Sequence, residues 1–269
     1  MDDTTKQTLS SWDVDVSQKN VVAYLALDLL GFFLSCRAAI KAMTTAQQAN
    51  MTASASEDKL NENYEPMTAE PCDYLRSAIA YASPTEPLLI AIGGLSGTGK
   101  STIARALACR VAKPPGAILI HSDAERKINA GVALRTTLPT RFYTKAVTEG
   151  NYRHIMEKAQ AALSAGQTVI VDSTFISAEN RIAVETLAQR VNAQFAGLWL
   201  QADETTMRER VAARKNDISD ATVSVLESQM AISHGEIDWL KIDSTQSLEK
   251  SVSSALVHLR HSIKLPQSR

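Results

Sequence analysis

Short apolar runs alternate with stripes of apolar residues at helical spacing over the last two thirds of the chain. The runs predict strands at 87–93, 117–121, 168–171, 194–200 and 237–242. The stripes predict a helix through Ile103, Leu107 and Val111, and further helices near 151–165, 178–191, 203–215, 221–233 and 248–263. Strands separated by helices favour an α/β fold with a five-stranded, mainly parallel sheet flanked by helices.

The first 86 residues follow a different pattern. Residues 1–42 predict one or two helices, an N-terminal helical extension that needs a surface to pack against. Residues 43–71 are polar and poorly patterned, which favours a flexible linker, and a short helix follows at 72–82. We therefore divide the chain into a helical segment at 1–42, a linker with a short helix at 43–86, and a main domain at 87–269.

The most lipid-like stretch is Val21–Ile40. Asp28 and Arg37 interrupt it, so we interpret it as a buried helix and expect no membrane partner. The chain begins Met-Asp-Asp without a signal-peptide pattern, and its three cysteines are too widely spaced for a zinc site or a disulfide framework. These features favour a reduced, cytoplasmic protein.

Composition narrows the class of partner. Of the 269 residues, 45% are hydrophobic and 21% charged, as in ordinary globular proteins. The net charge of −1 gives no general basic field for nucleic acid. Acidic residues are in excess before residue 86 and basic residues after it. This mildly cationic second part suits a polyphosphate ligand.

The first strand of the main domain runs directly into a phosphate-binding pattern. Gly94 to Ser101 reads G-x-x-x-x-G-K-[ST], the Walker A or P-loop motif, with a strand before it and a helix after it. Backbone N–H groups of such a loop cradle phosphate oxygens, and the helix N-terminus favours their charge. The expected nucleotide-binding residues are Gly94, Leu95, Ser96, Gly97, Thr98, Gly99, Lys100, Ser101 and Thr102. Lys100 is expected to neutralise the β- and γ-phosphates of ATP.

Two aspartates follow the next strands. Asp172 ends the strand Val169-Ile170-Val171, and with the Ser101 hydroxyl it is expected to hold Mg²⁺; the alternative is a turn or helix-capping aspartate. Asp123 follows the second strand and is expected to act as the base that accepts a proton from a substrate hydroxyl. Parallel strands bring such residues to one crevice at their carboxyl ends.

Arginines complete the expected site. Arg126 lies one helical turn after Asp123 and is a candidate for substrate binding or for steadying that carboxylate. Arg210 and Arg214 lie four residues apart on a predicted helix and are expected to close over the ATP phosphates, with a solvated basic face as the alternative. Arg181 is a further substrate candidate, although a surface position in a first helical turn explains it equally well.

The spacing of His121, Asp123 and Asn129 invites comparison with the His-x-Asp catalytic loop of protein kinases. There, Asn follows the Asp by five residues, whereas Asn129 follows Asp123 by six. Such kinases also lack a P-loop. We therefore interpret this likeness as coincidence and assign His121 no role.

With these residues in place, the region from about 87 to 245 resembles the P-loop kinases grouped with zeta toxins, polynucleotide 5′-kinases and chloramphenicol phosphotransferase. The matching segments are 94–102, 122–126, 169–174 with Arg181, and 210–214. The resemblance implies that Asp123 is the base, that Arg126 contacts substrate and that Arg214 contacts the ATP phosphates.

A second resemblance is to the ATP-binding half of bacterial fusion proteins that also carry an aminoglycoside phosphotransferase-like domain. It rests on residues 197–200, 217–221 and 237–239, and on 32–41, which resemble the tail of the upstream domain. The catalytic core of that upstream domain is absent from the sequence, so no aminoglycoside chemistry is assigned. The likeness implies an upstream kinase-like domain, or self-association through residues 21–40, as partners.

These features predict an ATP-dependent kinase that moves the γ-phosphoryl group to a hydroxyl of a small molecule or nucleotide, with Lys100, Asp123 and Arg214 as catalytic residues. One alternative is a nucleic-acid 5′-hydroxyl kinase, for which the basic and aromatic residues of 126–145 would form the groove. Another is a nucleotide-binding regulatory module that signals through residues 1–85. The acceptor is not legible in the sequence.

Overall fold

The computed structural model describes residues 27–55, 69–83, 85–113, 115–214 and 217–263. These residues fall into two compact units, one before residue 84 and one from there to the end. The second unit carries every residue that the sequence nominated for chemistry.

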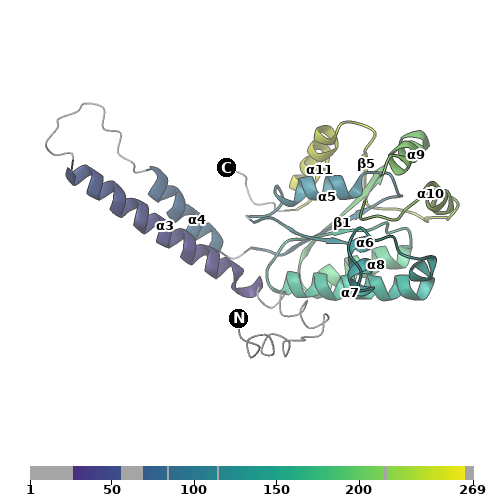
Figure 1. The fold of residues 1–269 in the computed structure, drawn as a ribbon, viewed down its shortest axis with the longest axis horizontal. Helices are drawn as coiled ribbons and strands as arrows, with labels where there is room; N and C mark the ends of the chain where they lie inside the picture. Colours follow the sequence, from purple (N-terminus) through teal and green to yellow (C-terminus); the bar gives the residue numbers. More distant parts are fainter. Residues whose placement is uncertain (1–26, 56–68, 84, 114, 215–216, 264–269) are drawn as a thin grey trace, which may run out of the picture. The chain divides into compact units, whose positions relative to one another are not determined.

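A parallel sheet forms the centre of the second unit (Figure 1). Its strands are β1 (Leu88–Gly93), β2 (Ile118–His121), β3 (Val169–Asp172), β4 (Gln194–Gln201) and β5 (Leu240–Asp243). The spatial order is β2-β3-β1-β4-β5, and each neighbouring pair is parallel. The predicted P-loop α/β fold with five strands is therefore confirmed.

Helices cover both faces of this sheet. The helices α5 (Lys100–Ala108) and α11 (Leu248–Ser262) lie on one face, and α7 (Lys145–Ser164) and α8 (Ala178–Arg190) lie on the other (Figure 1). The shorter elements are α6 (Ser122–Asn129), the 3-10 turn η1 (Thr140–Tyr143), α9 (Glu204–Ala212) and α10 (Val223–Met230). All six residues of β1 are buried, as expected for the central strand of a sheet covered on both faces.

The core under α5 and α11 fixes the start of α5. Ile103, Ala104 and Leu107 of α5 pack with Val252 and Leu259 of α11 over β1 and β4. Ile103 and Leu107 belong to the predicted apolar stripe, whereas Val111 lies beyond the end of α5, although it is buried in the same core. Burial of this stripe is the main force that holds the helix against the sheet. Because the phosphate loop joins β1 to α5, both of its ends are anchored in the core.

The register of the strands brings three chain segments to one edge. His121 pairs with Asp172 across β2 and β3, and Asp172 pairs with Ile92 across β3 and β1. The carboxyl ends of these three parallel strands therefore meet, which is where α/β sheets bind their ligands.

The first unit is a helical hairpin of α3 (Leu27–Ala55) and α4 (Ala69–Ala82), which pack against each other. The predicted linker at 43–71 is wrong over 43–55, where α3 continues, and over 69–71, where α4 has already begun. Alanine, methionine and glutamine favour this helix, and the Thr44 and Thr45 hydroxyls bond back to the Lys41 carbonyl instead of ending it. The remainder of that predicted linker up to 68, and the predicted helical part before residue 27, lie outside the described residues.

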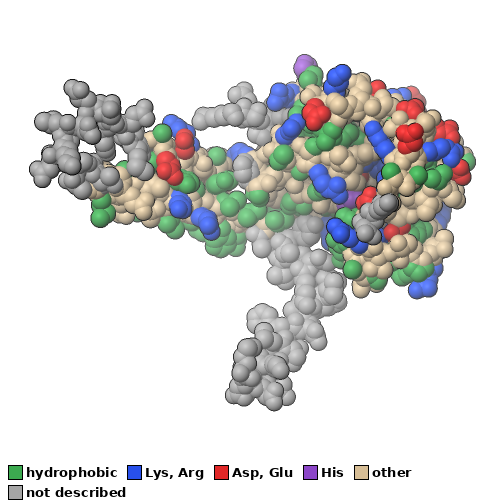
Figure 2. Space-filling model, turned by 45° about the horizontal axis from the view of Figure 1, so that its top comes forward, with side chains coloured by type: hydrophobic (Ala, Val, Ile, Leu, Met, Phe, Trp, Pro, Cys, Tyr) green, Lys and Arg blue, Asp and Glu red, His purple; other side chains and the backbone are tan. Residues whose placement is uncertain are grey.

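The interpretation of Val21–Ile40 as a buried helix is also wrong for its described part. Among the described side chains of α3, Ala38 alone is buried, because the shorter α4 covers only one side. The exposed apolar residues of α3 are Leu29, Phe32, Phe33, Ile40, Met43 and Met51. Figure 2 shows hydrophobic side chains gathered along this hairpin. By length and composition alone, the segment Leu29–Met51 is also apolar enough to span a membrane.

Candidate active site

The phosphate loop is held in a tight arch by its glycines. Gly94, Gly97 and Gly99 have φ values of 136°, 89° and 81°, a region that residues with a side chain rarely adopt. A Cβ atom on Gly97 would lie 2.5 Å from the Met207 carbonyl oxygen of α9. The loop therefore packs backbone to backbone against α9, and Gly97 tolerates no side chain.

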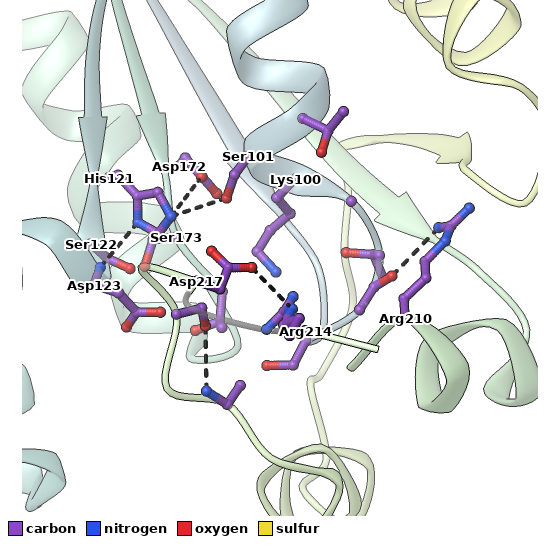
Figure 3. A pocket seen from close by; sticks show the side chains of 18 of the residues that line it. Lys100, Ser101, His121, Ser122, Asp123, Asp172, Ser173, Arg210, Arg214 and Asp217 are labelled. Atoms are coloured by element: carbon purple, nitrogen blue, oxygen red, sulfur yellow. Dashed lines mark hydrogen bonds and ion pairs between the residues drawn. The ribbon is translucent and has the colours of Figure 1, made fainter. Parts of the chain in front are cut away.

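A cavity of about 640 Å³ opens at the carboxyl edge of the sheet, a size typical of sites for small molecules. Its lining includes most of the predicted residues, namely Ser96, Gly97, Thr98, Gly99, Lys100, Ser101, Thr102, Asp123, Arg126, Asp172, Arg210 and Arg214. Gly94 and Leu95 belong to the loop but do not line the cavity. Figure 3 shows the central side chains converging on one space.

Lys100 lies on the floor of the cavity. Its Nζ donates to the Leu95 carbonyl oxygen at 2.8 Å, which folds the side chain back over the loop. Burial lowers the pKa of its ammonium group to about 8, while the carboxylates of Asp172 and Asp123 oppose this shift and Arg214 adds to it. A phosphate group would restore the charge of this ammonium, since an adjacent anion favours the protonated form.

Asp172 is almost fully buried beside the loop. Its Oδ2 atom has no hydrogen-bond partner, and the nearest charged or ionisable group is the His121 ring, with Nε2 at 3.6 Å. The Ser101 hydroxyl lies on the same side of this ring, 3.0 Å from the same nitrogen (Figure 3). A buried carboxylate oxygen without a partner, next to a hydroxyl, fits a site for Mg²⁺, which usually takes one or two protein oxygens and completes its shell with phosphate and water. Among the described residues, no group of three or more His, Cys, Asp or Glu side chains is arranged to hold a metal ion by itself.

Asp123 stands at the start of α6 and lines the cavity on the side away from the loop. Its backbone N–H donates to His121 Nδ1 at 3.2 Å, so the histidine ring caps the helix. Arg126, one turn later, is 8% exposed and donates to the Phe142 carbonyl oxygen at 2.8 Å. Its guanidinium also lies over the Tyr143 ring, 4.8 Å from the centroid. Arg126 therefore lines the cavity while it holds the segment around η1.

The two predicted lid arginines both reach the cavity, but from different elements. Arg210 lies on α9 and donates to the carbonyl oxygens of Gly97 at 3.4 Å and Ser244 at 2.8 Å. The predicted helix extends to 215, whereas α9 ends at Ala212, so Arg214 lies in the following loop and not on the same helical face. Its Nε atom is 3.5 Å from Asp217 Oδ2, and its Nη1 atom is buried without a partner.

Arg181 does not line the cavity, so the structure corrects its prediction as a substrate residue. It is 5% exposed, and its guanidinium donates to four carbonyl oxygens, of Phe175, Ile176, His234 and Glu236. It is not the surface residue of the alternative interpretation either. Its role is to join the segment after β3 to the segment before β5.

Sequence reasoning missed a buried ion pair beside the cavity. Lys127 is fully buried and donates to Asp220 Oδ1 at 2.7 Å, while Asp220 Oδ2 accepts bonds from the Leu138 backbone and the Tyr143 hydroxyl. Although burial opposes ionisation, these bonds hold the pKa of Asp220 below its ordinary value. The pattern offered no signal for this pair, because Lys127 stands in a charged run that resembles a solvated helix face.

Two more residues were missed. Gln229 of α10 accepts a hydrogen bond from the Ser96 backbone at 2.9 Å and so supports the phosphate loop from a distant segment. His121 was dismissed, although its position at the end of β2, one strand away from Asp172, was a signal that the order of the strands could have revealed.

A family model described as "AAA domain" matches residues 89–233. An uncharacterized protein of Mycobacterium tuberculosis is 30% identical over 174 residues, which is 62% of this chain and 34% of that protein. A shikimate kinase of Bradyrhizobium diazoefficiens is 30% identical over 143 residues, covering 49% of this chain and 61% of that enzyme.

Among solved structures, a gluconokinase from Sinorhizobium meliloti is similar at 24% identity and a TM-score of 0.47, covering 66% of this chain and 94% of that one. The chain spans about a third of the length of the mycobacterial relative that it matches.

Proposed function

The chain belongs to the AAA domain family, and from this premise we propose that it is an ATP-dependent phosphotransferase. It moves the γ-phosphoryl group of ATP to a hydroxyl of a small molecule or nucleotide. One observation carries the proposal: Lys100, Asp123 and Asp172, which follow three neighbouring strands, line the same cavity.

The phosphate loop binds the triphosphate in this proposal. Backbone N–H groups of the loop donate to its oxygens, and the N-terminus of α5 favours their negative charge. Lys100 leaves the Leu95 carbonyl and binds the β- and γ-phosphates. Arg210 and Arg214 approach from the α9 side and neutralise charge that develops during transfer.

Asp123 acts on the acceptor. Its carboxylate accepts the proton of the acceptor hydroxyl as the hydroxyl oxygen attacks the γ-phosphorus. The bond between the γ-phosphorus and the oxygen that bridges it to the β-phosphate breaks, and ADP leaves with that oxygen. Ser101 and Asp172 are the residues that hold Mg²⁺. When bound, this ion neutralises phosphate charge and aligns the β- and γ-phosphates for in-line transfer.

Arg126 contacts the acceptor with the part of its guanidinium that the Phe142 carbonyl leaves free. The hydrogen bond from Arg126 to the Phe142 carbonyl holds the segment around η1 beside the acceptor, so this segment is the lid on the acceptor side of the cavity. Arg181 has no place in this mechanism.

The segment 126–145 favours a small acceptor over a nucleic acid. Lys127 is fully buried against Asp220, and Arg126 is turned inward to the Phe142 carbonyl. Two of the basic side chains that suggested a groove for a strand are therefore engaged within the protein. The exposed Arg141, stacked 5.2 Å from the Phe142 ring, keeps a 5′-hydroxyl kinase as the second candidate.

The finer grouping with zeta toxins, polynucleotide kinases and chloramphenicol phosphotransferase is part of the proposal. So is the division of the chain into 1–42, 43–86 and 87–269, with the first segment as the remnant of an upstream domain. The exposed apolar residues of α3 support an upstream kinase-like domain or a second copy as partner. The cytoplasmic location is also part of the proposal.

A search for products tests the function. Metabolite extract is incubated with γ-labelled ATP and either the intact protein or Asp123→Asn, and newly phosphorylated compounds are identified by mass spectrometry. We expect products that depend on Asp123. Nucleotide binding without any new product would favour the regulatory module, and labelled oligonucleotides would favour the 5′-hydroxyl kinase. Identical products from both variants would remove Asp123 as the base.

A further inference from the structure

His121 occupies the centre of the candidate site, yet the mechanism above gives it no task. Its ring lies between three groups that the mechanism does use: the Ser101 hydroxyl, the Asp172 carboxylate and the backbone at Asp123 (Figure 3). The strand register causes this placement, since His121 pairs with Asp172 at the ends of β2 and β3.

The hydrogen bonds of the ring determine its protonation. The Asp123 backbone N–H is 3.2 Å from Nδ1, and a backbone N–H can only donate. Nδ1 therefore accepts and carries no proton in this bond. A histidine ring must keep a proton on one nitrogen unless it is an imidazolate, so Nε2 carries it.

The position of that proton limits what His121 can do. Nε2 lies 3.0 Å from Ser101 Oγ and 3.6 Å from Asp172 Oδ2, and both are the oxygens assigned to Mg²⁺. A protonated ring nitrogen has no lone pair for a metal ion, so His121 is not a ligand in this arrangement. It is instead a hydrogen-bond donor to a residue that is one.

We propose that His121 is a positioning residue that ties the metal-binding oxygens to the helix that carries the base. Its Nε2–H donates to the Ser101 hydroxyl and faces Asp172, and its Nδ1 caps α6 at Asp123. The inference rests on the proposed function, because it needs Ser101 and Asp172 to hold the metal ion. Groups that orient metal ligands in this way typically affect metal affinity by about 10–100-fold.

The two ends of the ring can be separated by substitution. In His121→Asn the shorter side chain can still accept from the Asp123 N–H, because asparagine is among the best residues for capping a helix. It does not reach as far as Nε2, so Ser101 loses this donor and Asp172 loses the N–H that faces it. In His121→Leu both functions are lost. His261→Asn, at an exposed position of α11, is the matched control.

The test measures metal binding without turnover. Mn²⁺ is titrated into the full chain with a non-hydrolysable ATP analogue and followed by electron paramagnetic resonance, and nucleotide affinity is measured separately in EDTA. For His121→Asn we expect Mn²⁺ affinity to fall by about 10–100-fold, with unchanged nucleotide affinity in EDTA and an unchanged melting temperature. His261→Asn should match the unsubstituted protein.

Three results would overturn the inference. The first is an Mn²⁺ affinity of His121→Asn equal to that of the unsubstituted protein. The second is a loss of nucleotide affinity in EDTA as large as the loss of Mn²⁺ affinity. The third is a nitrogen coupling that shows imidazole bound directly to Mn²⁺. If the unsubstituted protein binds no nucleotide at all, the proposed function fails first, and the two failures are thus distinguished.

Discussion

Two sets of buried charged groups in the second unit differ in one respect. At the cavity, Asp172 Oδ2, Arg214 Nη1 and Arg126 Nε are buried and have no hydrogen-bond partner. Other buried charged groups are bonded within the chain: Arg181 donates to four carbonyl oxygens, and Lys127 pairs with Asp220, which also lines the cavity. Among the described residues, one further buried side-chain nitrogen or oxygen lacks a hydrogen bond, His154 Nε2, which lies 3.6 Å from Glu125 Oε2.

The presence or absence of a partner within the chain distinguishes groups that can bind a ligand from groups that support the fold. A buried polar group without a partner costs free energy, so it persists where something outside the chain completes it. Both signs of charge are left incomplete at the cavity, as a site for metal and phosphate together requires. The groups that are bonded within the chain hold its segments in place.

The sharpest way to break this comparison is to remove a cavity charge. In Lys100→Ala we expect phosphoryl transfer to fall by about 10²–10³-fold, since a group aimed at developing charge is lost. Stability should hardly change. Turnover and thermal unfolding are measured together, with Lys241→Ala on the exposed face of β5 as control. Unchanged turnover in Lys100→Ala would mean that the cavity cation has no part in the reaction.

The opposite result is expected for a saturated group. Arg181→Met leaves four carbonyl oxygens without their donor, so the free energy of unfolding should fall by about 3 kcal/mol. ATP affinity of the folded protein should stay as it was. Urea unfolding and calorimetric titration measure the two quantities, and Arg190→Met at the exposed end of α8 is the control. If Arg181→Met lost ATP affinity but kept its normal stability, Arg181 would belong to the ligand-binding site after all.

The contribution of the Lys127–Asp220 pair to stability should depend on pH. The pKa of Asp220 is lowered in the folded protein, so its ionised form stabilises the fold above its unfolded pKa of about 3.9, and this contribution is lost as the pH falls through the folded value. Asp220→Asn should therefore reduce the free energy of unfolding by about 2 kcal/mol at neutral pH, and by progressively less in acid.

Urea unfolding across this range measures the effect, and Asp238→Asn at an exposed position is the control. A difference between the Asp220 variant and the unsubstituted protein that is independent of pH would show that the charge of Asp220 does not matter.

The fold of the second unit could be predicted well from the sequence. Its strands and helices carry strong apolar patterns, and the phosphate loop lies between β1 and α5 as the motif requires. The same patterns failed in the first unit at 43–55, a helical segment without a regular apolar stripe. The helix propensity of its alanine, methionine and glutamine residues decided the structure there.

Part of the site was also within reach of the sequence. Asp123 and Asp172 follow strands and were found by that rule, because parallel strands end at one edge. Arg181 and Lys127 show the limit. Asp220, the partner of Lys127, and two of the four acceptors of Arg181, His234 and Glu236, lie far away in the chain, so no local pattern encodes these contacts. A charged residue looks the same in the sequence whether it meets a ligand or a carbonyl.

A crystal structure with Mg²⁺ and a non-hydrolysable ATP analogue tests the central claim most directly. We expect the triphosphate in the loop formed by residues 94–102, the metal ion against Ser101 and Asp172, and the Asp123 carboxylate facing the terminal phosphate. A nucleotide bound elsewhere, or an Asp123 carboxylate turned away from that phosphate, would contradict the assignment of this cavity to phosphoryl transfer.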